Sequence, residues 1–318
     1  MGTPPHEENL RVGIVMAGGY GERLWPLSRS KRPKQLLQLL DNNESLLGAT
    51  VRRIAPMILG DRLYVVTNRS LQKIIQDGVP DIPAENVIAE PHKRNTSACI
   101  ALAAAKVMAM YPDGEDDTTM AILTADHRVN DDDAFRSTVA KALEAAETED
   151  KLVLIGIHPT RPETAYGYVE VPEKISNDSI LSETLPVMRF REKPNKEVAE
   201  EFISTGRFFW NSGMFFWKLS VFLKELDEAM PTLAMATREM AECFRRDTED
   251  SMKRLSRIFE GLGDISIDYG LMEKSSSVVL IPAQFSWDDL GSWDSLRRAW
   301  EKDRHGNISK GGSVLVGT

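Results

Sequence analysis

The chain has 318 residues, 42% hydrophobic and 27% charged, which is the composition of an ordinary soluble protein with enough residues for a substantial core. Its 39 Lys and Arg residues against 48 Asp and Glu residues give a net charge of −9, which argues against nucleic acid and anionic membranes as partners. Both cysteines, Cys99 and Cys243, lie in apolar helical patterns, which indicates a reducing compartment without disulfides. Neither a signal core nor a membrane-spanning stretch is present, so we expect a cytoplasmic protein.

Short apolar strands alternate with helical patterns over the first half of the chain. This alternation predicts an α/β fold, in which a mostly parallel sheet carries helices on both faces. The helix expected over 96–110 is apolar nearly all round and should therefore be buried. In this half we expect strands at 11–17, 62–67, 86–90, 119–124 and 152–157, and helices at 45–59, 70–77, 96–110 and 133–148.

The second half contains longer strand patterns of alternating polarity, at 166–171 and 185–192, on either side of a polar loop around 176–182. A helical pattern over 221–244 should break near Pro231, because proline cannot continue a helix. We predict a main domain over 1–303 and the glycine-rich start of a small C-terminal β segment over 304–318, with further helices at 195–204, 250–260 and 292–301 and a strand at 277–285.

A glycine-rich and cationic loop, "AGGYGERLWPLSRSKRPKQ", follows the first expected strand. Glycines let backbone N–H groups approach a ligand closely, and N–H groups with Arg and Lys suit phosphate. The loop is not a P-loop, and it departs from the dinucleotide motif G-x-G-x-x-G because Leu24 stands at the third glycine position. These residues predict a phosphate site without defining its kind.

The segments "AGGYGERLWPLS" and "RPKQL" resemble the signature of the sugar-nucleotide pyrophosphorylases, and specifically that of the bacterial mannose-1-phosphate guanylyltransferases. The resemblance implies a Rossmann-like nucleotidyltransferase fold and the reaction of GTP with mannose 1-phosphate to give GDP-mannose and diphosphate. It extends from about residue 11 to residue 300 through further segments in the family's order, namely "AEPHKRNTS", "LTADHRV", "PTRPETAYGYVEV", "REKP", "FWNSGMFFW", "ISIDYGLMEKS" and "WDDLGSW".

Two acidic positions are the candidate metal ligands. Asp126 in "LTADHRV" lies just past the carboxyl end of a predicted strand, where ligands bind in open α/β sheets, although an aspartate there also caps turns. In "WDDLGSW", Asp289 matches the family's metal aspartate, and we expect Asp288 to face solvent. Mg²⁺ on a triphosphate takes one or two carboxylates together with phosphate oxygens and water, so the resemblance implies Mg²⁺ on Asp126 and Asp289.

Glu192 and Lys193 in "REKP" are adjacent on a predicted strand, so both reach one ligand only at a strand end or bulge. Taken alone, they also fit a solvated charge run. By resemblance, Glu192 binds hexose hydroxyls and Lys193 binds the sugar phosphate. Asn211 would lie on the sugar, unless it is a buried amide satisfied by backbone, and Gly167 would let the backbone approach that sugar.

The segment "AEPHKRNTS" supplies the remaining nucleotide-binding candidates. Asn95 and Thr96 could contact the nucleotide, or one of them could cap the helix that begins there. Guanine presents N1–H and N2–H₂ donors along one edge, and Glu90 could accept from them. His127 and His158 are interpreted as hydrogen-bonded structural residues. The full nucleotide-binding set is Ala17, Gly18, Gly19, Gly21, Glu90, Asn95 and Thr96.

The implied reaction needs no general base, because the sugar phosphate oxygen that attacks the α-phosphorus of GTP is already anionic. Catalysis then consists of holding two polyanions in line and neutralising charge, for which the candidates are Arg23, Lys34, Asp126 and Asp289. Two alternatives stay open at this point: a catalytically weak regulatory protein that binds a nucleotide sugar, and a nucleotidyltransferase for another base or sugar. The expected partners are small molecules, GTP and mannose 1-phosphate, and a homodimer is one assembly left open.

Overall fold

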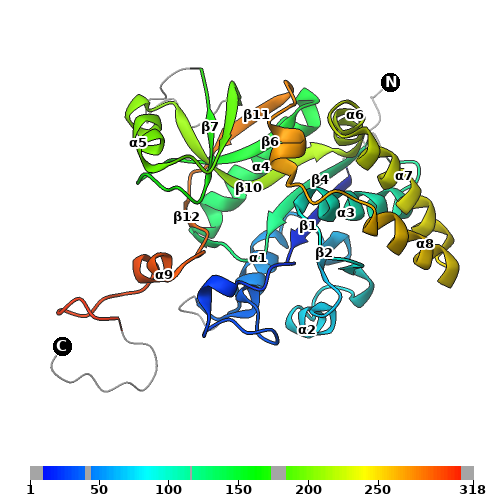
Figure 1. Cartoon of the computed structure of the whole chain (residues 1–318), viewed down its shortest axis with the longest axis horizontal. Coiled ribbons are helices and arrows are strands. Elements are labelled where there is room, and N and C mark those ends of the chain that lie inside the picture. The colour runs from blue at the N-terminus through cyan, green and yellow to red at the C-terminus, as the bar shows by residue number, and fades with distance from the viewer. Residues whose placement is uncertain (1–9, 40–43, 115–116, 173–183, 309–318) are drawn as a thin grey trace, which may run out of the picture.

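The computed structural model describes residues 10–39, 44–114, 117–172 and 184–308 (Figure 1). Within them a ten-stranded mixed sheet has the order β3-β2-β1-β4-β10-β6-β11-β8, and β7 pairs with β10 and β9. The strands are β1 (Leu10–Met16), β2 (Leu63–Asn68), β3 (Val87–Glu90), β4 (Thr118–Thr124), β6 (Leu152–Ile157), β7 (Gly167–Glu170), β8 (Leu185–Pro186), β9 (Arg189–Glu192), β10 (Phe208–Lys218) and β11 (Val278–Pro282), with β5 (Arg128–Asn130) and β12 (Ser286–Asp288) paired separately.

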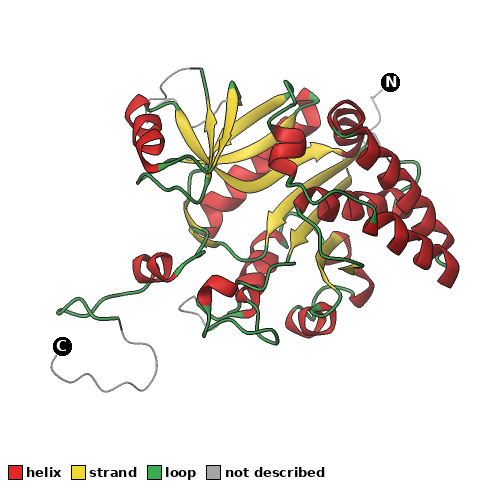
Figure 2. Cartoon of the chain, in the orientation of Figure 1, coloured by secondary structure: helices red, strands yellow, loops and turns green. Residues whose placement is uncertain are grey.

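Helices cover both faces of the sheet (Figure 2). Helices α3, α6, α7 and α8 contribute to one hydrophobic cluster, and α1, α2, α4 and α5 contribute to another. The α/β fold class and the helices on both faces are therefore confirmed. The helices are α1 (Leu46–Ile54), α2 (Gln72–Gly78), α3 (Thr96–Met110), α4 (Asp132–Glu149), α5 (Lys196–Thr205), α6 (Leu219–Ala229), α7 (Pro231–Arg246), α8 (Glu249–Glu260) and α9 (Trp293–Ala299).

The first half of the chain forms the parallel part of the sheet, as its alternating pattern predicts. Strand β1 pairs in parallel with β2 and β4, and β2 pairs in parallel with β3. Strand β6 runs the same way and pairs in parallel with β11. In such a sheet the carboxyl ends of the strands share one edge, which is where ligands bind in open α/β folds.

Strand β10 is the main element that the sequence pattern did not reveal. It runs antiparallel between β4 and β6 in the middle of the sheet. Because it is buried on both faces, its sequence "FFWNSGMFFWK" lacks the apolar–polar alternation of a half-exposed strand. Its pairing with β6 shifts register between Asn211 and Phe215, and Gly213 within this bulge has φ 71°.

Of the other predicted boundaries, one is confirmed and several differ. Pro231 does break the helical pattern, because it begins α7 directly after α6. The strand expected over 185–192 is two short strands, β8 and β9, and the one expected over 277–285 ends at Pro282. Residues 304–308 form no strand, while the rest of the expected C-terminal segment and the loop around 176–182 lie outside the described residues.

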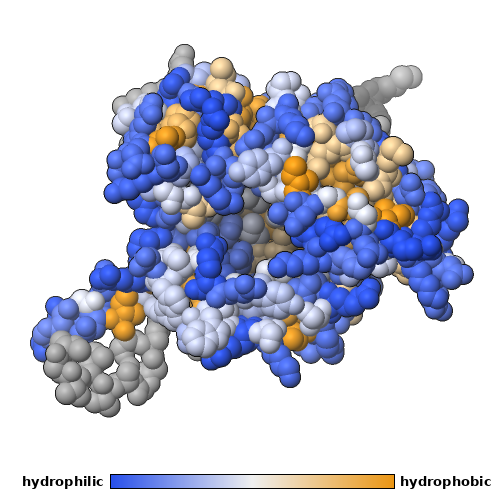
Figure 3. Space-filling view, in the orientation of Figure 1, coloured by the Kyte–Doolittle hydropathy of each residue, from blue (hydrophilic) through white to orange (hydrophobic). Residues whose placement is uncertain are grey.

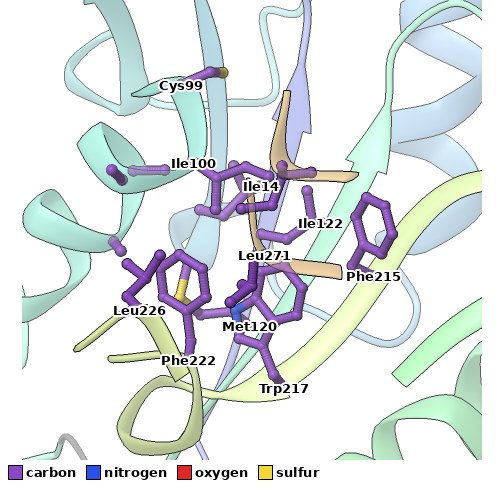
Figure 4. Close-up of a cluster of buried hydrophobic side chains, with 14 of the residues drawn as sticks. Ile14, Cys99, Ile100, Met120, Ile122, Phe215, Trp217, Phe222, Leu226 and Leu271 are labelled. Carbon is purple, nitrogen blue, oxygen red and sulfur yellow. The ribbon is translucent and has the colours of Figure 1, made fainter. Parts of the chain in front are cut away.

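Alternating side chains of the central strands fill two cores. Ile14 and Ile122 point to the cluster under α3 and α6, while Val15 and Leu123 point to the opposite cluster. Helix α3 is buried over almost its whole length, as its all-round apolar sequence predicts. Figure 4 shows the first cluster, where residues of β1, β4 and β10 meet α3 and α6.

A third, smaller cluster joins two loops that are far apart in the chain. Leu24 and Leu37 from the cationic loop pack with Leu290 and Leu296 near α9. Burying an aliphatic side chain contributes roughly 1.5–3 kcal/mol, so this contact holds the loop of residues 17–39 against residues 289–296. Figure 3 shows the face of the molecule hollowed near its middle, with mainly hydrophilic residues around the hollow.

Candidate active site

The turn after β1 presents backbone N–H groups without partners from the chain. Among the described residues, none accepts a hydrogen bond from the N–H groups of residues 18–21. Ala17 differs from them, because its N–H donates to the Val66 carbonyl and its own carbonyl accepts from Gln35 and Thr67. The turn is thus anchored at Ala17, and the free donors that suit an anion begin at Gly18.

Lys34 lies at the centre of a charged cluster. Its ammonium Nζ is 2.8 Å from Asp126 Oδ2 and also donates to the backbone carbonyl of Asp289. Gly21 makes room for this side chain, because it has φ 67° and a Cβ there would overlap the Cβ of Lys34. Arg23 Nη2 lies beside Asp289, since a Cβ added at Gly291 would contact both groups. We call Arg23, Lys34, Asp126 and Asp289 the Lys34 cluster.

Asp289 is held in place by two donors. Its Oδ1 accepts from the Tyr166 hydroxyl at 2.8 Å and from the Gly291 N–H at 2.8 Å. The expectation that Asp288 faces solvent is wrong. Only 15% of its side chain is exposed, because its carboxylate lies 3.4 Å from Arg161 and 3.3 Å from Arg298 and accepts from the Leu290 N–H.

The charges around Asp126 favour its ionised form. Burial raises the pKa of Asp126, but Lys34, His127 and Arg23 together outweigh burial and lower the pKa below its usual value. Burial lowers the pKa of His127, whose Nδ1 accepts from Trp287 Nε1 at 3.1 Å and lies 2.6 Å from Thr124 Oγ1. His127 is therefore a hydrogen-bonded structural residue, as the sequence indicated.

The Lys34 cluster offers a divalent cation two carboxylate side chains, those of Asp126 and Asp289. Among the described residues, no group of three or more His, Cys, Asp or Glu side chains is arranged to hold a metal ion. Asp126 and Asp289 come from different loops and meet at Lys34, and both hydrogen bonds to the Asp289 carboxylate go to Oδ1. Two carboxylates fit Mg²⁺ when phosphate oxygens and water complete its shell.

Glu90, at the end of β3, carries a buried carboxyl group. Only 6% of the residue is exposed, and Oε1 has no hydrogen-bond partner among the described residues. Burial raises the pKa of Glu90 to about 7. A Cβ added at Gly18 would lie 3.1 Å from Glu90 Oε2, so this carboxyl group adjoins the free N–H groups of the turn.

The segment after Glu90 is fixed to the helices around it. Asn95 caps α3, with its side chain accepting from the Thr96 N–H, so the capping role is confirmed for Asn95. Thr96 Oγ1 accepts from the Ile267 N–H at 2.9 Å. Arg94, which the sequence argument missed, donates to the carbonyls of Leu262 and Glu260 at the C-terminal end of α8.

Glu192 and Lys193 lie at the end of β9, where the chain turns. Lys193 has φ 48°, and its ammonium lies 2.9 Å from Glu192 Oε1. Gly167 pairs with Glu192 across β7 and β9, and a Cβ at Gly167 would overlap Glu192 Oε2. That buried Oε2 has no hydrogen-bond partner among the described residues. The strand end that both side chains need to reach one ligand is therefore present.

Asn211 is held between its own strand and a residue that the sequence argument missed. Its Oδ1 accepts from the Gly213 N–H at 3.0 Å, and its Nδ2 donates to Asp268 Oδ1 at 2.7 Å. Burial and the nearby Glu192 raise the pKa of Asp268 to about 6. "ISIDYGLMEKS" is one of the family segments, and nothing local in the sequence indicates that its aspartate faces Asn211. We call Gly167, Glu192, Lys193, Asn211 and Asp268 the Asn211 cluster.

Tyr166 connects the two clusters. Its hydroxyl donates to Asp289 of the Lys34 cluster, and its backbone carbonyl accepts from the N–H of Lys193 in the Asn211 cluster. The predicted site residues thus occupy the strand ends and loops around one edge of the sheet. His158 belongs to neither cluster; its ring packs against the Phe209 ring, with 4.5 Å between the ring centroids.

The fold and this site define a class of enzyme. A family model described as nucleotidyl transferase matches residues 12–306, and the chain belongs to that family. It is 37% identical over 307 residues to the mannose-1-phosphate guanylyltransferase of Salmonella montevideo, with 94% of this chain and 62% of that protein covered. It is also 37% identical over 310 residues to the alginate biosynthesis protein AlgA of Pseudomonas fluorescens, with 96% and 61% covered.

A solved structure is similar over most of both chains. The crystal structure described as a mannose-1-phosphate geranyltransferase from Thermus thermophilus matches with a TM-score of 0.78 and 34% identity, covering 93% of this chain and 80% of that one. The chain spans less than two thirds of the length of the curated relatives named above. In the described part of the chain, no helix combines the length and apolarity needed to span a bilayer.

Proposed function

We propose that this chain is a mannose-1-phosphate guanylyltransferase, which converts GTP and mannose 1-phosphate into GDP-mannose and diphosphate. The observation that carries the proposal is the Lys34 cluster, where one ammonium contacts the Asp126 carboxylate and the Asp289 carbonyl with Arg23 alongside. Two curated relatives at 37% identity support it, one of them called a mannose-1-phosphate guanylyltransferase.

In the proposed step, an oxygen of the sugar phosphate attacks the α-phosphorus of GTP. The bond from that phosphorus to the β-phosphate bridging oxygen breaks, and diphosphate leaves with the electron pair. The attacking oxygen is already anionic, so no side chain has to remove a proton. Arg23, Lys34 and the N–H groups of Gly18, Gly19 and Gly21 would bind the triphosphate and offset charge on the transferring group.

Mg²⁺ belongs to the proposal as a cofactor held by Asp126 and Asp289. Bound there, it would neutralise negative charge on the triphosphate. Although burial raises it, the pKa of Asp126 is held below its usual value by Lys34, His127 and Arg23 together, so this residue is ionised at neutral pH. Tyr166 and the Gly291 N–H orient the Asp289 carboxylate from the side of Oδ1.

Glu90 is the proposed reader of the guanine base. An ionised carboxylate accepts from both N1–H and N2–H₂ of guanine, and its buried Oε1 has no other partner among the described residues. Leaving a buried acceptor unpaired costs roughly 1–3 kcal/mol, so a base that lacks these donors would bind less well. Asn95 and Thr96 lie beyond Glu90 in the chain and would approach the nucleotide from the start of α3.

The Asn211 cluster is the proposed hexose 1-phosphate site. Glu192 Oε2 is buried without a partner among the described residues and offers an acceptor to a hexose hydroxyl. Lys193 would bind the sugar phosphate, since its hydrogen bond to Glu192 raises the pKa of Lys193 and keeps it cationic. Gly167 lets the backbone of β7 approach the Glu192 carboxylate closely, because a Cβ there would overlap Oε2.

A matrix of nucleotides and sugar phosphates tests this function. GTP, UTP, dTTP and ATP are each combined with mannose 1-phosphate and glucose 1-phosphate, and diphosphate release and the nucleotide sugar are measured with Mg²⁺ and with EDTA. We expect diphosphate and GDP-mannose from GTP with mannose 1-phosphate, and no release in EDTA. Equal turnover with UTP would make the enzyme a nucleotidyltransferase of broader specificity, and binding without turnover in any pair would favour a regulatory protein.

A further inference from the structure

Asp268 is a half-buried acid that the proposed reaction, as described so far, does not use. It begins a short π-helical turn of residues 268–272 and points at the Asn211 amide, whose Nδ2 donates to it at 2.7 Å. Asn211 is fixed from its other side by the Gly213 N–H in the bulge of β10. The amide and the carboxyl group therefore have one mutual orientation, set by the backbone on both sides.

We propose that Asp268 is a hexose-binding residue, and that with Glu192 and Asn211 it selects the hydroxyl pattern of the sugar. This inference rests on the proposed function and names a further specificity residue within it. Its basis is that a third polar group lies beside Glu192, whose buried Oε2 packs against Gly167 and is unpartnered among the described residues. A hexose ring presents several hydroxyls in fixed directions, and each matched carboxylate or amide contributes to discrimination between epimers.

The rigid backbone around Asp268 supports a binding role, because the segment before it is hydrogen-bonded to the buried helix α3. The Ile267 N–H donates to Thr96 Oγ1, and Ser97 Oγ donates to the Ile265 carbonyl at 2.6 Å. Ile267 itself is buried in the main core. A side chain held on such a rigid support loses little further freedom when a ligand binds, which favours selective recognition.

The charges around Asp268 give the proposal a pH signature. Glu192 and Lys193 face it from the end of β9, and Asn211 faces it from β10, while the neighbouring Tyr269 is exposed. Burial and Glu192 raise the pKa of Asp268 to about 6, so it becomes a full acceptor only as pH rises through that value. The contribution of Asp268 to sugar binding should therefore grow between about pH 5 and pH 7.

The test compares Asp268→Asn with wild type in kcat and in KM for each substrate, from about pH 5.5 to 8. Asparagine can keep a hydrogen bond to Asn211 and removes the charge. We expect kcat/KM for mannose 1-phosphate to fall about 10- to 100-fold at about pH 7.5, as for the loss of a charge-assisted hydrogen bond, with KM for GTP within about twofold of wild type. The wild-type-to-variant ratio should grow as pH rises through about 6. Since the phosphate of the substrate titrates equally in both proteins, that ratio isolates Asp268.

Asp264→Asn is the matched control, because it makes the same change four residues earlier at an exposed position and should leave both substrates unaffected. Isothermal titration of GDP-mannose into each protein measures binding without turnover, and melting temperatures check folding. A pH-independent loss, or an equal loss for GTP, would overturn the hexose-binding role. Wild-type enzyme that makes no GDP-mannose would instead contradict the proposed function.

Discussion

The Lys34 cluster and the Asn211 cluster lie on either side of Tyr166, and they differ in how their polar groups are satisfied. In the Lys34 cluster, opposite charges contact each other directly at Lys34 and Asp126, and Tyr166 donates to Asp289. The Asn211 cluster also contains an ion pair, between Lys193 and Glu192, but it brings two acids together and leaves a buried Glu192 oxygen without a partner among the described residues. Glu90, beside the glycine turn, resembles the second cluster in this respect.

This difference matches the chemistry proposed for each side. Phosphate groups are strongly charged, so a site for them needs positive charge in fixed positions, and mutual ion pairs keep that charge in place before substrate arrives. Hydroxyls and base edges are neutral, and selectivity for them comes from acceptors that stay unpaired until the correct ligand binds. Substitutions in each cluster should therefore have different effects on the two substrates.

Asp126→Asn and Asp289→Asn should each lower kcat at saturating Mg²⁺ by on the order of 100-fold or more, the loss typical when one preorganised electrostatic contact is removed. Each change keeps the shape of the side chain but removes a negative charge next to Lys34 or Arg23. Asp133→Asn is the control, since its side chain is 93% exposed. Near-wild-type turnover in either variant, with the fold checked by circular dichroism, would rule out a direct role for that aspartate.

Lys193→Ala should lower kcat/KM for mannose 1-phosphate by about 10- to 100-fold, because a charge-assisted hydrogen bond contributes roughly 1.5–3 kcal/mol. The affinity for GTP, measured by titration, should stay close to that of wild type. Lys196→Ala provides the comparison, as Lys196 is a similarly exposed lysine nearby that pairs with Glu200 in its own helix. If both variants behave alike, Lys193 belongs to the solvated surface and the Asn211 cluster lacks a phosphate contact.

Glu90→Gln should change the pH dependence of GTP binding. Burial raises the pKa of Glu90 to about 7, so the wild-type KM for GTP should fall severalfold as pH rises from about 6 to 8 and the acid ionises. The variant has no charge to gain, so its KM for GTP should vary less with pH. The variant should also discriminate less between GTP and ATP. Glu85→Gln, an exposed change five residues earlier, should retain the wild-type profile.

The raised pKa of Glu90 also predicts that the free energy of unfolding decreases as pH rises. Between about pH 4.5 and 7 the folded protein binds more protons at Glu90 than the unfolded chain, so stability decreases as pH rises through this window. At about pH 8 the ligand-free Glu90→Gln protein should then be more stable than wild type, by up to about 3 kcal/mol at roughly 1.4 kcal/mol per pKa unit. Denaturant unfolding at about pH 5 and pH 8 measures the difference, and an equal effect at both pH values would contradict it.

Gly19→Ala and Gly21→Ala distinguish a glycine that leaves room for the ligand from one that the folded backbone requires. A Cβ at Gly21 would overlap Lys34 and demand φ 67°, so this variant should lose about 1–2 kcal/mol of unfolding free energy. At Gly19, a Cβ meets nothing within 4 Å, and the free protein should keep its stability while KM for GTP rises a few-fold. Unchanged GTP binding in Gly19→Ala would indicate that the phosphates lie elsewhere along the turn.

Local patterns in the sequence were enough for the parallel half of the sheet and for most helices. Helix α3 and strand β6 have the predicted bounds, and Pro231 separates α6 from α7, because periodicity, capping residues and proline act within a few residues of chain. Strand β10 was not predicted from the sequence pattern, since burial on both faces removes the alternation that identifies a strand. The residue types of the Lys34 cluster fit the chemistry of phosphate and Mg²⁺, and the family resemblance singled out Asp289 among them.

Tertiary structure alone decided which distant residues meet. Asp268 contacts Asn211 from 57 positions away, and Arg94 reaches the end of α8 from 168 positions away, so neither pairing leaves a periodic signal in the sequence. The expectation of a solvent-facing Asp288 was wrong because nothing local in the sequence shows that Arg161 folds onto it. The raised pKa values of Glu90 and Asp268 depend most on the fold, since they come chiefly from desolvation by segments that approach through space.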